Sequence, residues 1–288
     1  MNFKAIFSVG ISAIMLASCG NQPKTETPAT TAKADTVVQR IVGDDGKLYQ
    51  SEQFADLRVL HYYIPQWDSL SAKQKELVYY LYEAGLAGRD IMFDQNCKYN
   101  LPIRHALEKV YTTYSGDKTT EDWKNLESYL KQMWAHTGIH HHYNSTKNMP
   151  AFSQDYFEDV CDATGTEVSD DVLKAMFDKD FMAMKVESDV SKDLIASSAV
   201  NFYEGVTTQE VEDFYSKLRT PGNRTPFEYG LNSKLVKENG QVVEKPWKVG
   251  GLYTEALEKV VYWLEKAERV AENDKQAAAL RLLRSYYM

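Results

Sequence analysis

The residues with the clearest capacity for chemistry are four of the six histidines, which lie in HTGIHHHYN, residues 136–144. Histidine is the commonest metal ligand in proteins. His136 and His140 are four residues apart and would share one face of a helix, as the ligands of zinc metallopeptidases do. Such enzymes need a glutamate after the first histidine as general base, and Thr137 stands there. Gly138 further lowers helix propensity by about 1 kcal/mol.

An extended conformation of the same segment gives a different arrangement. His140 and His142 would then point to one side and His141 to the other. Either conformation supplies two metal ligands at most, and a third would have to come from a distant part of the chain. We therefore favour a loop that lies on the surface or lines a cleft over a zinc site, and we expect this chain to bind no metal.

Other catalytic patterns are absent from the sequence. There is no G-x-S-x-G nucleophile turn, no Walker loop and no G-x-G-x-x-G fingerprint. Cys97 and Cys161 lack flanking residues typical of a reactive thiolate, and the sequence leaves open whether they form a disulfide or stay as two buried thiols. Glu204 and Glu228 have aromatic neighbours, but such carboxylates are usually surface residues. The sequence therefore contains no recognisable catalytic centre.

Composition and charge set the class of protein. The chain has 288 residues, of which 43% are hydrophobic, enough for a globular domain with a sizeable core. The formal net charge is −8 and the sequence pI is about 5.4. No basic stripe exists to displace counterions from phosphates, so nucleic acid is excluded as a partner.

The N-terminal residues predict export and a lipid anchor. Lys4 precedes an apolar run at residues 5–17 that is too short to span a membrane. Leu16-Ala17-Ser18-Cys19 fits the lipobox of bacterial lipoproteins, which predicts a signal peptide over residues 1–18 and lipidation of Cys19. The alternative is an ordinary signal peptide that contains a cysteine by chance.

The segment after Cys19 differs in composition from the rest of the chain. Residues 21–35 are rich in Thr, Pro and Ala and have no apolar periodicity, so residues 19–44 are predicted to be the lipidated N-terminus and a flexible tether. Residues 45–288 form the folded part. The protein is thus expected to be an exported lipoprotein anchored to a membrane by lipid.

Helix signals dominate the folded part. Capping residues followed by apolar residues at helical spacing predict helix starts at Ser71, Thr119, Ser169 and Thr207, and a long amphipathic stretch over 252–288 is interrupted at Asn273. Strands are predicted at 37–43 and 57–65. The sequence 233–245 predicts a tight hairpin, because Asn239-Gly240 accepts the positive φ angles of a type I′ turn. These elements predict an α+β fold, mainly helical, with a small antiparallel sheet.

Five segments, in this order, resemble the N-terminal half of the dipeptidyl peptidase III family, zinc exopeptidases that trim dipeptides from peptide N-termini. The resemblance runs from about residue 45 to the end of the chain. The segments are YYLYEAGLAGRDI at 79–91, HTGIHHHYNSTKNMP at 136–150, VNFYEGVT at 200–207, the hairpin YGLNSKL at 229–235 within the block 227–253, and LEKVVYWLEKAERVAEN at 257–273.

The resemblance implies that the chain is the lower lobe of a two-lobed peptidase. In that family zinc and the catalytic glutamate belong to the other lobe, on H-E-x-x-G-H, which is absent here. The complete enzyme is thus expected to use zinc, while this chain has no catalytic residue and is inactive alone. By position, His142, Tyr143 and Asn144 match the part that lines the substrate cleft, although many members lack a histidine triplet there.

The resemblance also implies that the lobe is incomplete at its C-terminus, and that its partners are peptide substrates and a separately encoded catalytic half. Two other functions stay open at this point. One is a lipid-anchored module that binds a peptide or protein without catalysis. The other is a truncated fragment with no function.

Overall fold

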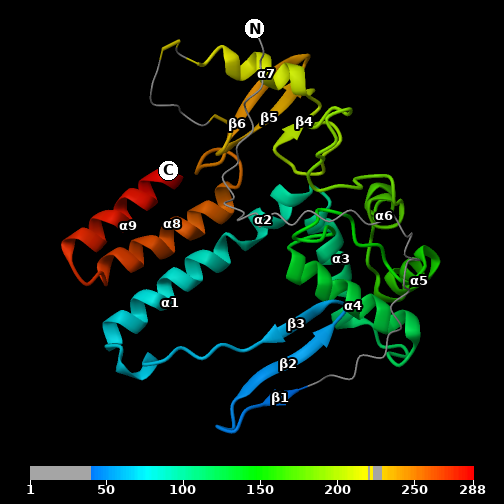
Figure 1. The fold of residues 1–288 in the computed structure, drawn as a ribbon, viewed down its shortest axis with the longest axis horizontal. Helices are drawn as coiled ribbons and strands as arrows, with labels where there is room; N and C mark the ends of the chain where they lie inside the picture. The colour runs from blue at the N-terminus through cyan, green and yellow to red at the C-terminus, as the bar shows by residue number, and fades with distance from the viewer. Residues whose placement is uncertain (1–39, 220, 223–228) are drawn as a thin grey trace, which may run out of the picture. The chain divides into compact units, whose positions relative to one another are not determined.

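The computed structural model describes residues 40–219, 221–222 and 229–288, which belong to one compact unit (Figure 1). The predicted signal peptide, Cys19, most of the tether and Glu228 lie outside the described residues. Among the described helices, none combines the length and the apolar character needed to cross a bilayer. The described part is mainly helical and has two small sheets, which confirms the predicted α+β class.

The helices and strands follow one another in a mixed order along the chain. The strands are β1 (Ile41–Val42), β2 (Leu48–Phe54), β3 (Leu57–Leu60), β4 (Tyr203–Glu204), β5 (Ser233–Glu238) and β6 (Gln241–Pro246). The helices are η1 (Trp67–Ser69), α1 (Ala72–Ala87), α2 (Arg89–Asn96), α3 (Asn100–Thr113), α4 (Glu121–His136), α5 (Gln154–Thr164), α6 (Asp170–Phe177), α7 (Thr208–Ser216), α8 (Thr254–Arg269) and α9 (Asp274–Tyr287).

Most predicted helix starts are confirmed by their caps. Ser71 and Thr207 form complete capping boxes, and Ser169 and Asn273 accept hydrogen bonds as N-caps. The predicted start at Thr119 is wrong by one residue. Thr120 caps α4 instead. Thr119 donates its N–H (2.8 Å) and its hydroxyl (2.6 Å) to Asp117 Oδ1, so its side chain belongs to the turn before the helix.

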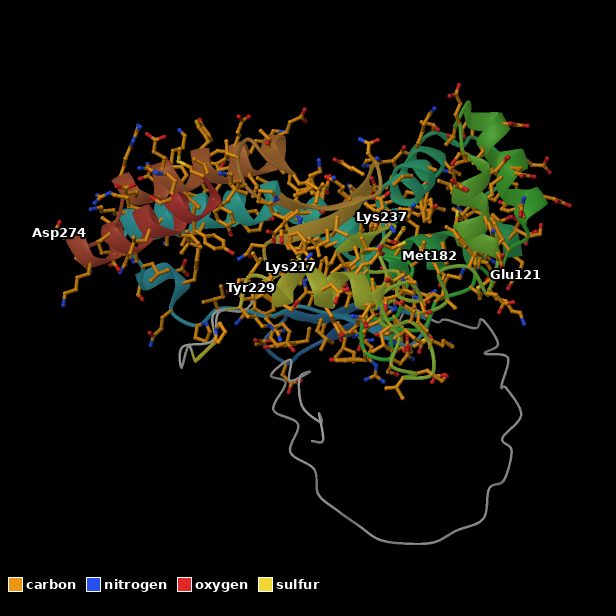
Figure 2. All side chains as sticks on the ribbon, turned by 90° about the horizontal axis from the view of Figure 1, so that it is seen from above. Glu121, Met182, Lys217, Tyr229, Lys237 and Asp274 are labelled. Atoms are coloured by element: carbon orange, nitrogen blue, oxygen red, sulfur yellow. The ribbon has the colours of Figure 1, made fainter. Side chains whose placement is uncertain are left out.

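The predicted hairpin is confirmed. Asn239 and Gly240 have φ angles of 50° and 78°, so they form the two-residue turn between β5 and β6. Lys237 marks this hairpin among the side chains of Figure 2. β4 adds to β5 in parallel, which makes this sheet mixed, whereas β1, β2 and β3 form an antiparallel sheet.

The strand predicted over 57–65 ends earlier than expected. Only Leu57–Leu60 is a strand, and the last backbone contact with β2 is the bond from the His61 N–H to the Tyr49 carbonyl, at 3.0 Å. Since β2 begins at Leu48, the backbone of the residues that follow has no strand partner there, and the Leu48 carbonyl accepts the Tyr63 hydroxyl instead, at 3.1 Å. β2 itself was not predicted, and of the strand predicted at 37–43 only Ile41–Val42 forms within the described residues.

Apolar side chains gather in three clusters. The largest joins α3, α4, α5 and α6 around Trp123 and Phe157. The second joins α1, α8 and α9, and the third lies between the β5–β6 hairpin and α7. Leu81, on α1, and Leu218, which follows α7, stay 40% and 45% exposed.

A single carboxylate organises the entry to α7. Asp193 accepts hydrogen bonds from the N–H groups of Ile195 (3.0 Å), Ala196 (2.9 Å) and Thr208 (3.1 Å), and from the Thr208 hydroxyl (2.9 Å). Thr208 is the first residue of α7, so the negative charge also faces a helix N-terminus. The Ala196 N–H and the other donors hold the pKa of Asp193 below its usual value.

We expect Asp193→Asn to lower the free energy of unfolding at pH 7 by about 1–2 kcal/mol, because a charged acceptor is replaced by a neutral amide at a half-exposed position. A lowered pKa in the folded state means that the stabilisation is present above the unfolded pKa of about 3.9 and is lost as the pH falls through the folded value. Urea unfolding of both proteins should therefore show a difference that shrinks towards pH 3. A difference that stays constant with pH would contradict this account.

Candidate functional site

The histidine segment leaves helical structure as soon as it begins. α4 ends at His136, and Thr137 takes the left-handed conformation with φ 57°. Gly138 follows with φ 140° and donates its N–H to the Met133 carbonyl at 3.0 Å. The possibility that His136 and His140 share a helical face is therefore wrong, because the helix is closed by a left-handed cap between them.

Asn100, at the start of α3, fixes the path of the chain after this cap. Its side chain is fully buried; Nδ2 donates to the Phe93 carbonyl (2.9 Å), and Oδ1 accepts the Ile139 N–H (3.1 Å). A Cβ at Gly138 would lie 2.1 Å from Asn100 Nδ2. With the Asn100 amide in its observed position, only glycine therefore fits at residue 138.

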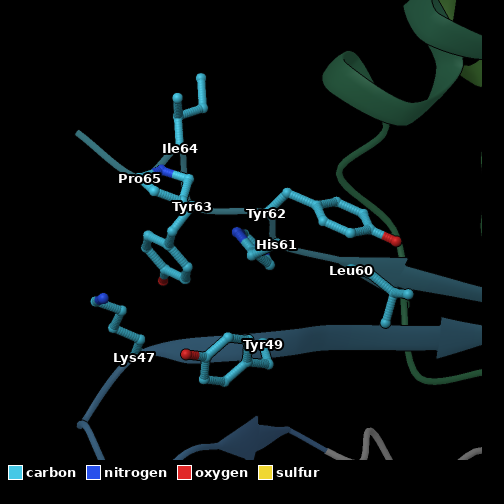
Figure 3. Close-up of a pocket in the computed structure, with 8 residues that line it drawn as sticks. All are labelled: Lys47, Tyr49, Leu60, His61, Tyr62, Tyr63, Ile64 and Pro65. Carbon is cyan, nitrogen blue, oxygen red and sulfur yellow. The ribbon is translucent and has the colours of Figure 1, made fainter. Parts of the chain in front are cut away.

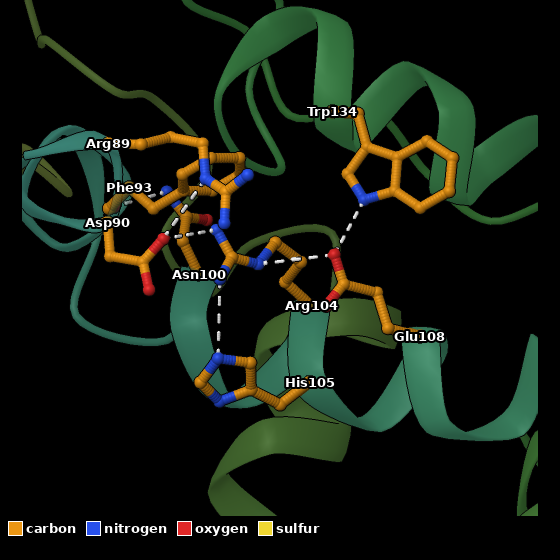
Figure 4. A network of polar contacts seen from close by, with 8 residues as sticks. All are labelled: Arg89, Asp90, Phe93, Asn100, Arg104, His105, Glu108 and Trp134. Atoms are coloured by element: carbon orange, nitrogen blue, oxygen red, sulfur yellow. Dashed lines mark hydrogen bonds and ion pairs between the residues drawn. The ribbon is translucent and has the colours of Figure 1, made fainter. Parts of the chain in front are cut away.

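A network around Arg104 positions the helices that carry these residues (Figure 4). Its guanidinium, on α3, donates to Asp90 Oδ1 of α2 at 2.9 Å and lies over the Phe93 ring at 4.5 Å. Glu108 lies 3.4 Å from Arg104 Nε and accepts the indole N–H of Trp134, on α4, at 2.9 Å. The hydrogen bond from Arg104 lowers the pKa of Asp90. The network thus joins α2, α3 and α4.

Beyond Ile139 the chain makes a tight loop. The His141 N–H donates to the Thr146 carbonyl at 2.8 Å, and Thr146 also bridges to Met184 in antiparallel fashion. Asn144 Oδ1 accepts the N–H (3.0 Å) and the hydroxyl (2.6 Å) of Thr146. The side-chain oxygen of Asn144 therefore stabilises the loop itself.

The loop brings three histidines together. One ring nitrogen from each of His136, His141 and His142 lies within 4.8 Å of the others. The Nδ1 atoms of His136 and His142 are 2.7 Å apart, which requires one proton between them. His140 points away, is 1% exposed and places Nε2 at 2.7 Å from the Met182 carbonyl. The expectation that His140 and His142 face one way, with two ligands at most, is wrong.

Burial keeps part of this group neutral. Desolvation, followed by repulsion from His141 and His142, lowers the pKa of His136 to about 4. Burial likewise lowers the pKa of His140 to about 4. Asp56, in the turn between β2 and β3, lies with Oδ2 at 3.4 Å from His141 Nε2. The rings of His136 and His140 therefore carry free lone pairs at neutral pH rather than positive charge.

Tyr143 is the most exposed part of the segment. Its side chain is 85% exposed, and its ring centroid lies 4.1 Å from that of His142. Of the residues predicted to line a cleft, His142 joins the histidine group, Tyr143 covers it and Asn144 builds the loop. Cys19, the predicted lipidation site, lies outside the described residues.

The cysteines of the folded part do no nucleophilic chemistry. Cys97 and Cys161 are buried and unpaired, so the alternative of two buried thiols is confirmed over a disulfide. Desolvation raises the pKa of each to about 11. Both are therefore protonated at neutral pH, and a protonated thiol is a poor nucleophile.

A second surface is apolar rather than polar. β3 and the residues after it line a pocket of about 570 Å³ together with Lys47 and Tyr49 (Figure 3). Within it Tyr62 is 87% and Ile64 is 66% exposed. Exposed apolar side chains gathered in this way are typical of a contact surface.

The sequence did not single out Asp56, Asn100 or the grouping of His136 with His141 and His142. The only local signal was Gly138, whose place between the histidines indicates a break in the helix. Asn100 had no signal at all, because a buried amide is recognised only by the two distant backbone groups that it contacts.

Comparison with solved structures gives a partial similarity. No protein-family model matches the chain, and no curated protein matches it. The chain is similar to the solved structure of DPP III from Caldithrix abyssi, with a TM-score of 0.47 and 19% sequence identity. The match covers 78% of this chain and 32% of that one, so the chain spans about a third of that protein's length.

We expect Gly138→Ala to destabilise the fold more than Gly165→Ala. Both glycines have positive φ, and an added Cβ at Gly165 meets nothing within 4 Å. The free energy of unfolding of Gly165→Ala should therefore fall only by the cost of a left-handed alanine, about 1–2 kcal/mol. Gly138→Ala must also displace the Asn100 amide, which adds roughly 1–3 kcal/mol for its lost hydrogen bonds. Chemical unfolding of the two variants measures the difference, and equal losses would show that the Asn100 contact is unimportant.

Proposed function

We propose that this chain is the non-catalytic, cleft-lining lobe of a zinc-dependent dipeptidyl peptidase, which releases dipeptides from peptide N-termini. The observation that carries the proposal is the set of five segments that resemble this family, in the family's order. The way in which these segments pack against one another supports it.

Two of the segments meet on neighbouring helices. Tyr80 on α1 stacks on Trp263 of α8, with ring centroids 6.0 Å apart, and Ala84 and Leu264 share the same buried cluster. In Figure 1 these helices run side by side. The residues that carry the resemblance here therefore serve packing, which is what a shared fold requires.

Two further segments meet through a polar network. Lys234 Nζ, on β5, donates to Asn201 Oδ1 at 2.7 Å and to Glu204 at 2.5 Å. Asn201 Nδ2 donates to Asp94 Oδ2 at 3.0 Å, and the Tyr253 hydroxyl donates to the same oxygen at 2.6 Å. Residues from VNFYEGVT and from the block 227–253 thus converge on one acid of α2.

The catalytic zinc of such an enzyme does not fit the residues of this chain. H-E-x-x-G-H is absent from the sequence, and the one described group of three close metal-ligating side chains has only histidines. Thr137 follows the first of them, where a general base would be needed. The chain alone is therefore proposed to hold peptide, with hydrolysis left to another part of the enzyme.

In this proposal His142, Tyr143 and Asn144 contact the peptide. An exposed aromatic ring on a fixed loop provides large contact area at low cost in conformational entropy. The competing function is a binding module without catalysis, and the exposed surface around Tyr62 and Ile64 favours it. The two functions assign the peptide or partner to different surfaces, which makes them separable.

We expect the purified chain to bind a short peptide with a free amino terminus, and Tyr143→Ala to weaken binding by roughly fivefold to tenfold, the value of one aromatic contact. Isothermal titration calorimetry measures the affinity. Tyr62→Ala is the matched control, since Tyr62 is 87% and Tyr143 85% exposed, and it should leave the affinity unchanged.

Loss of affinity in Tyr62→Ala alone would support the binding module instead. No binding by the wild-type chain, checked to be monomeric and cooperatively folded, would overturn the cleft-lining role. Release of a dipeptide by the chain alone would contradict the assignment of catalysis to another part of the enzyme.

We also propose that the protein is exported and held at a membrane through lipid on Cys19, since the cysteine lies where the apolar run ends. Cys19→Ser should move the protein from the membrane fraction to the soluble fraction of cells. An unchanged distribution would show that the cysteine belongs to an ordinary signal peptide or is not lipidated.

A further inference from the structure

Three imidazoles, one at the end of α4 and two in the loop after it, are placed as one ligand set. Their nearest ring nitrogens all lie within 4.8 Å of one another. In a tetrahedral zinc site, with Zn–N bonds of about 2.0–2.1 Å, ligand nitrogens are about 3.3–3.4 Å apart. The His136–His142 pair is closer, at 2.7 Å, and the widest separation exceeds the ideal by about 1.4 Å. Binding of one ion would therefore require the two side chains on the loop to rotate and close this excess.

We propose that His136, His141 and His142 bind one divalent transition-metal ion, with Zn²⁺ as the ion that best fits three imidazole ligands. Imidazole nitrogen suits Zn²⁺, Cu²⁺ and Ni²⁺, whereas Ca²⁺ and Mg²⁺ prefer oxygen ligands. The proposal does not depend on the peptidase function, because this site lacks the glutamate base of a metallopeptidase and lies on the chain that lacks the catalytic motif.

The state of His136 without a ligand is unfavourable. Its side chain is 3% exposed, its Nε2 has no hydrogen-bond partner, and its Nδ1 faces another imidazole nitrogen. Burial of a polar group without a partner costs free energy. A metal ion would accept lone pairs from both Nδ1 atoms, and the proton that it displaces would move to the Nε2 that lacks one. Coordination thus relieves the contact between the two Nδ1 atoms, while His136 Nε2 stays buried.

A carboxylate stands where a metal-bound histidine usually has one. Asp56 Oδ2 lies 3.4 Å from Nε2 of His141, and a carboxylate on the outer nitrogen orients a ligating ring and raises its basicity. His141 would then coordinate through Nδ1, and the ion would replace the hydrogen bonds that this atom accepts from the N–H groups of Tyr143 (3.2 Å) and Asn144 (3.3 Å). The β2–β3 hairpin that carries Asp56 is tied to α4 by Lys131, which pairs with Glu52 on β2 and, at 2.8 Å, with Glu127 on α4.

The ion would join three parts of the chain. His136 ends α4, His141 and His142 belong to the loop, and Asp56 comes from the hairpin some eighty residues earlier. Because an ion bound only by the folded state stabilises that state, occupancy should raise the thermal midpoint and fix the position of Tyr143, which packs on His142.

The test is titration of the full chain, freed of metal with a chelator, with Zn²⁺ by calorimetry and with Co²⁺ by visible absorption. We expect one ion per chain and a Co²⁺ spectrum typical of nitrogen ligands in a tetrahedral field. His142→Asn should raise the Kd for Zn²⁺ on the order of 100-fold. Asp56→Asn should raise it by about 10- to 100-fold, as is typical when a carboxylate bonded to a ligating histidine is removed. His61→Asn, which removes a histidine outside the group, is the control and should bind as the wild type does.

Circular dichroism establishes that each variant is folded. If His142→Asn is not, Asp56→Asn decides, because the Asp56 side chain is 67% exposed and plays no part in the core. The proposal is overturned if the folded wild type binds less than one equivalent of Zn²⁺, or if His141→Asn and His142→Asn bind it as tightly as the wild type. Failure of peptide binding leaves these outcomes unaffected, so the two proposals are judged separately.

Discussion

The arrangement of the candidate site depends on one buried amide. Asn100 donates to the carbonyl of Phe93, near the end of α2, and accepts from the N–H of Ile139, after α4. The Phe93 carbonyl also accepts the Cys97 N–H at 3.3 Å, whereas the Ile139 N–H lies outside any helix or strand and would be costly to leave unpaired in the interior. The same amide lies so close to residue 138 that only glycine passes it. The direction in which the chain leaves α4, and hence the position of every histidine after it, follows from this contact.

A second polar centre holds the more distant parts of the chain together. Asp94, Asn201, Lys234 and Tyr253 are separated along the sequence and joined by hydrogen bonds between side chains. Such networks add little net stability, but they penalise any packing that leaves a member unpaired. The hairpin of β5 and β6 and the start of α8 are thereby held relative to α2. These contacts give the polar side chains of Asn201, Lys234 and Tyr253 a structural role.

The chemistry of the loop follows from desolvation. A histidine in water is partly protonated near neutral pH, but His136 and His140 are buried and their pKa values fall to about 4. Of these two, His136 belongs to the group of three, and the carboxylate of Asp56 lies beside its member His141. A cluster of charged histidines would repel itself, whereas a cluster of neutral ones is suited to a cation.

Local sequence determined the features that depend on neighbouring residues. The caps at Ser71, Ser169, Thr207 and Asn273 and the Asn239-Gly240 turn were predictable, because each satisfies backbone groups within three or four positions. The mainly helical α+β class follows from the same signals. The tertiary structure alone decided that residues 61–65 leave the sheet, that His140 turns inward, and that His136 joins His141 and His142. Those outcomes depend on where β2 begins and on the Asn100 amide, partners that lie far along the chain and that no local pattern specifies.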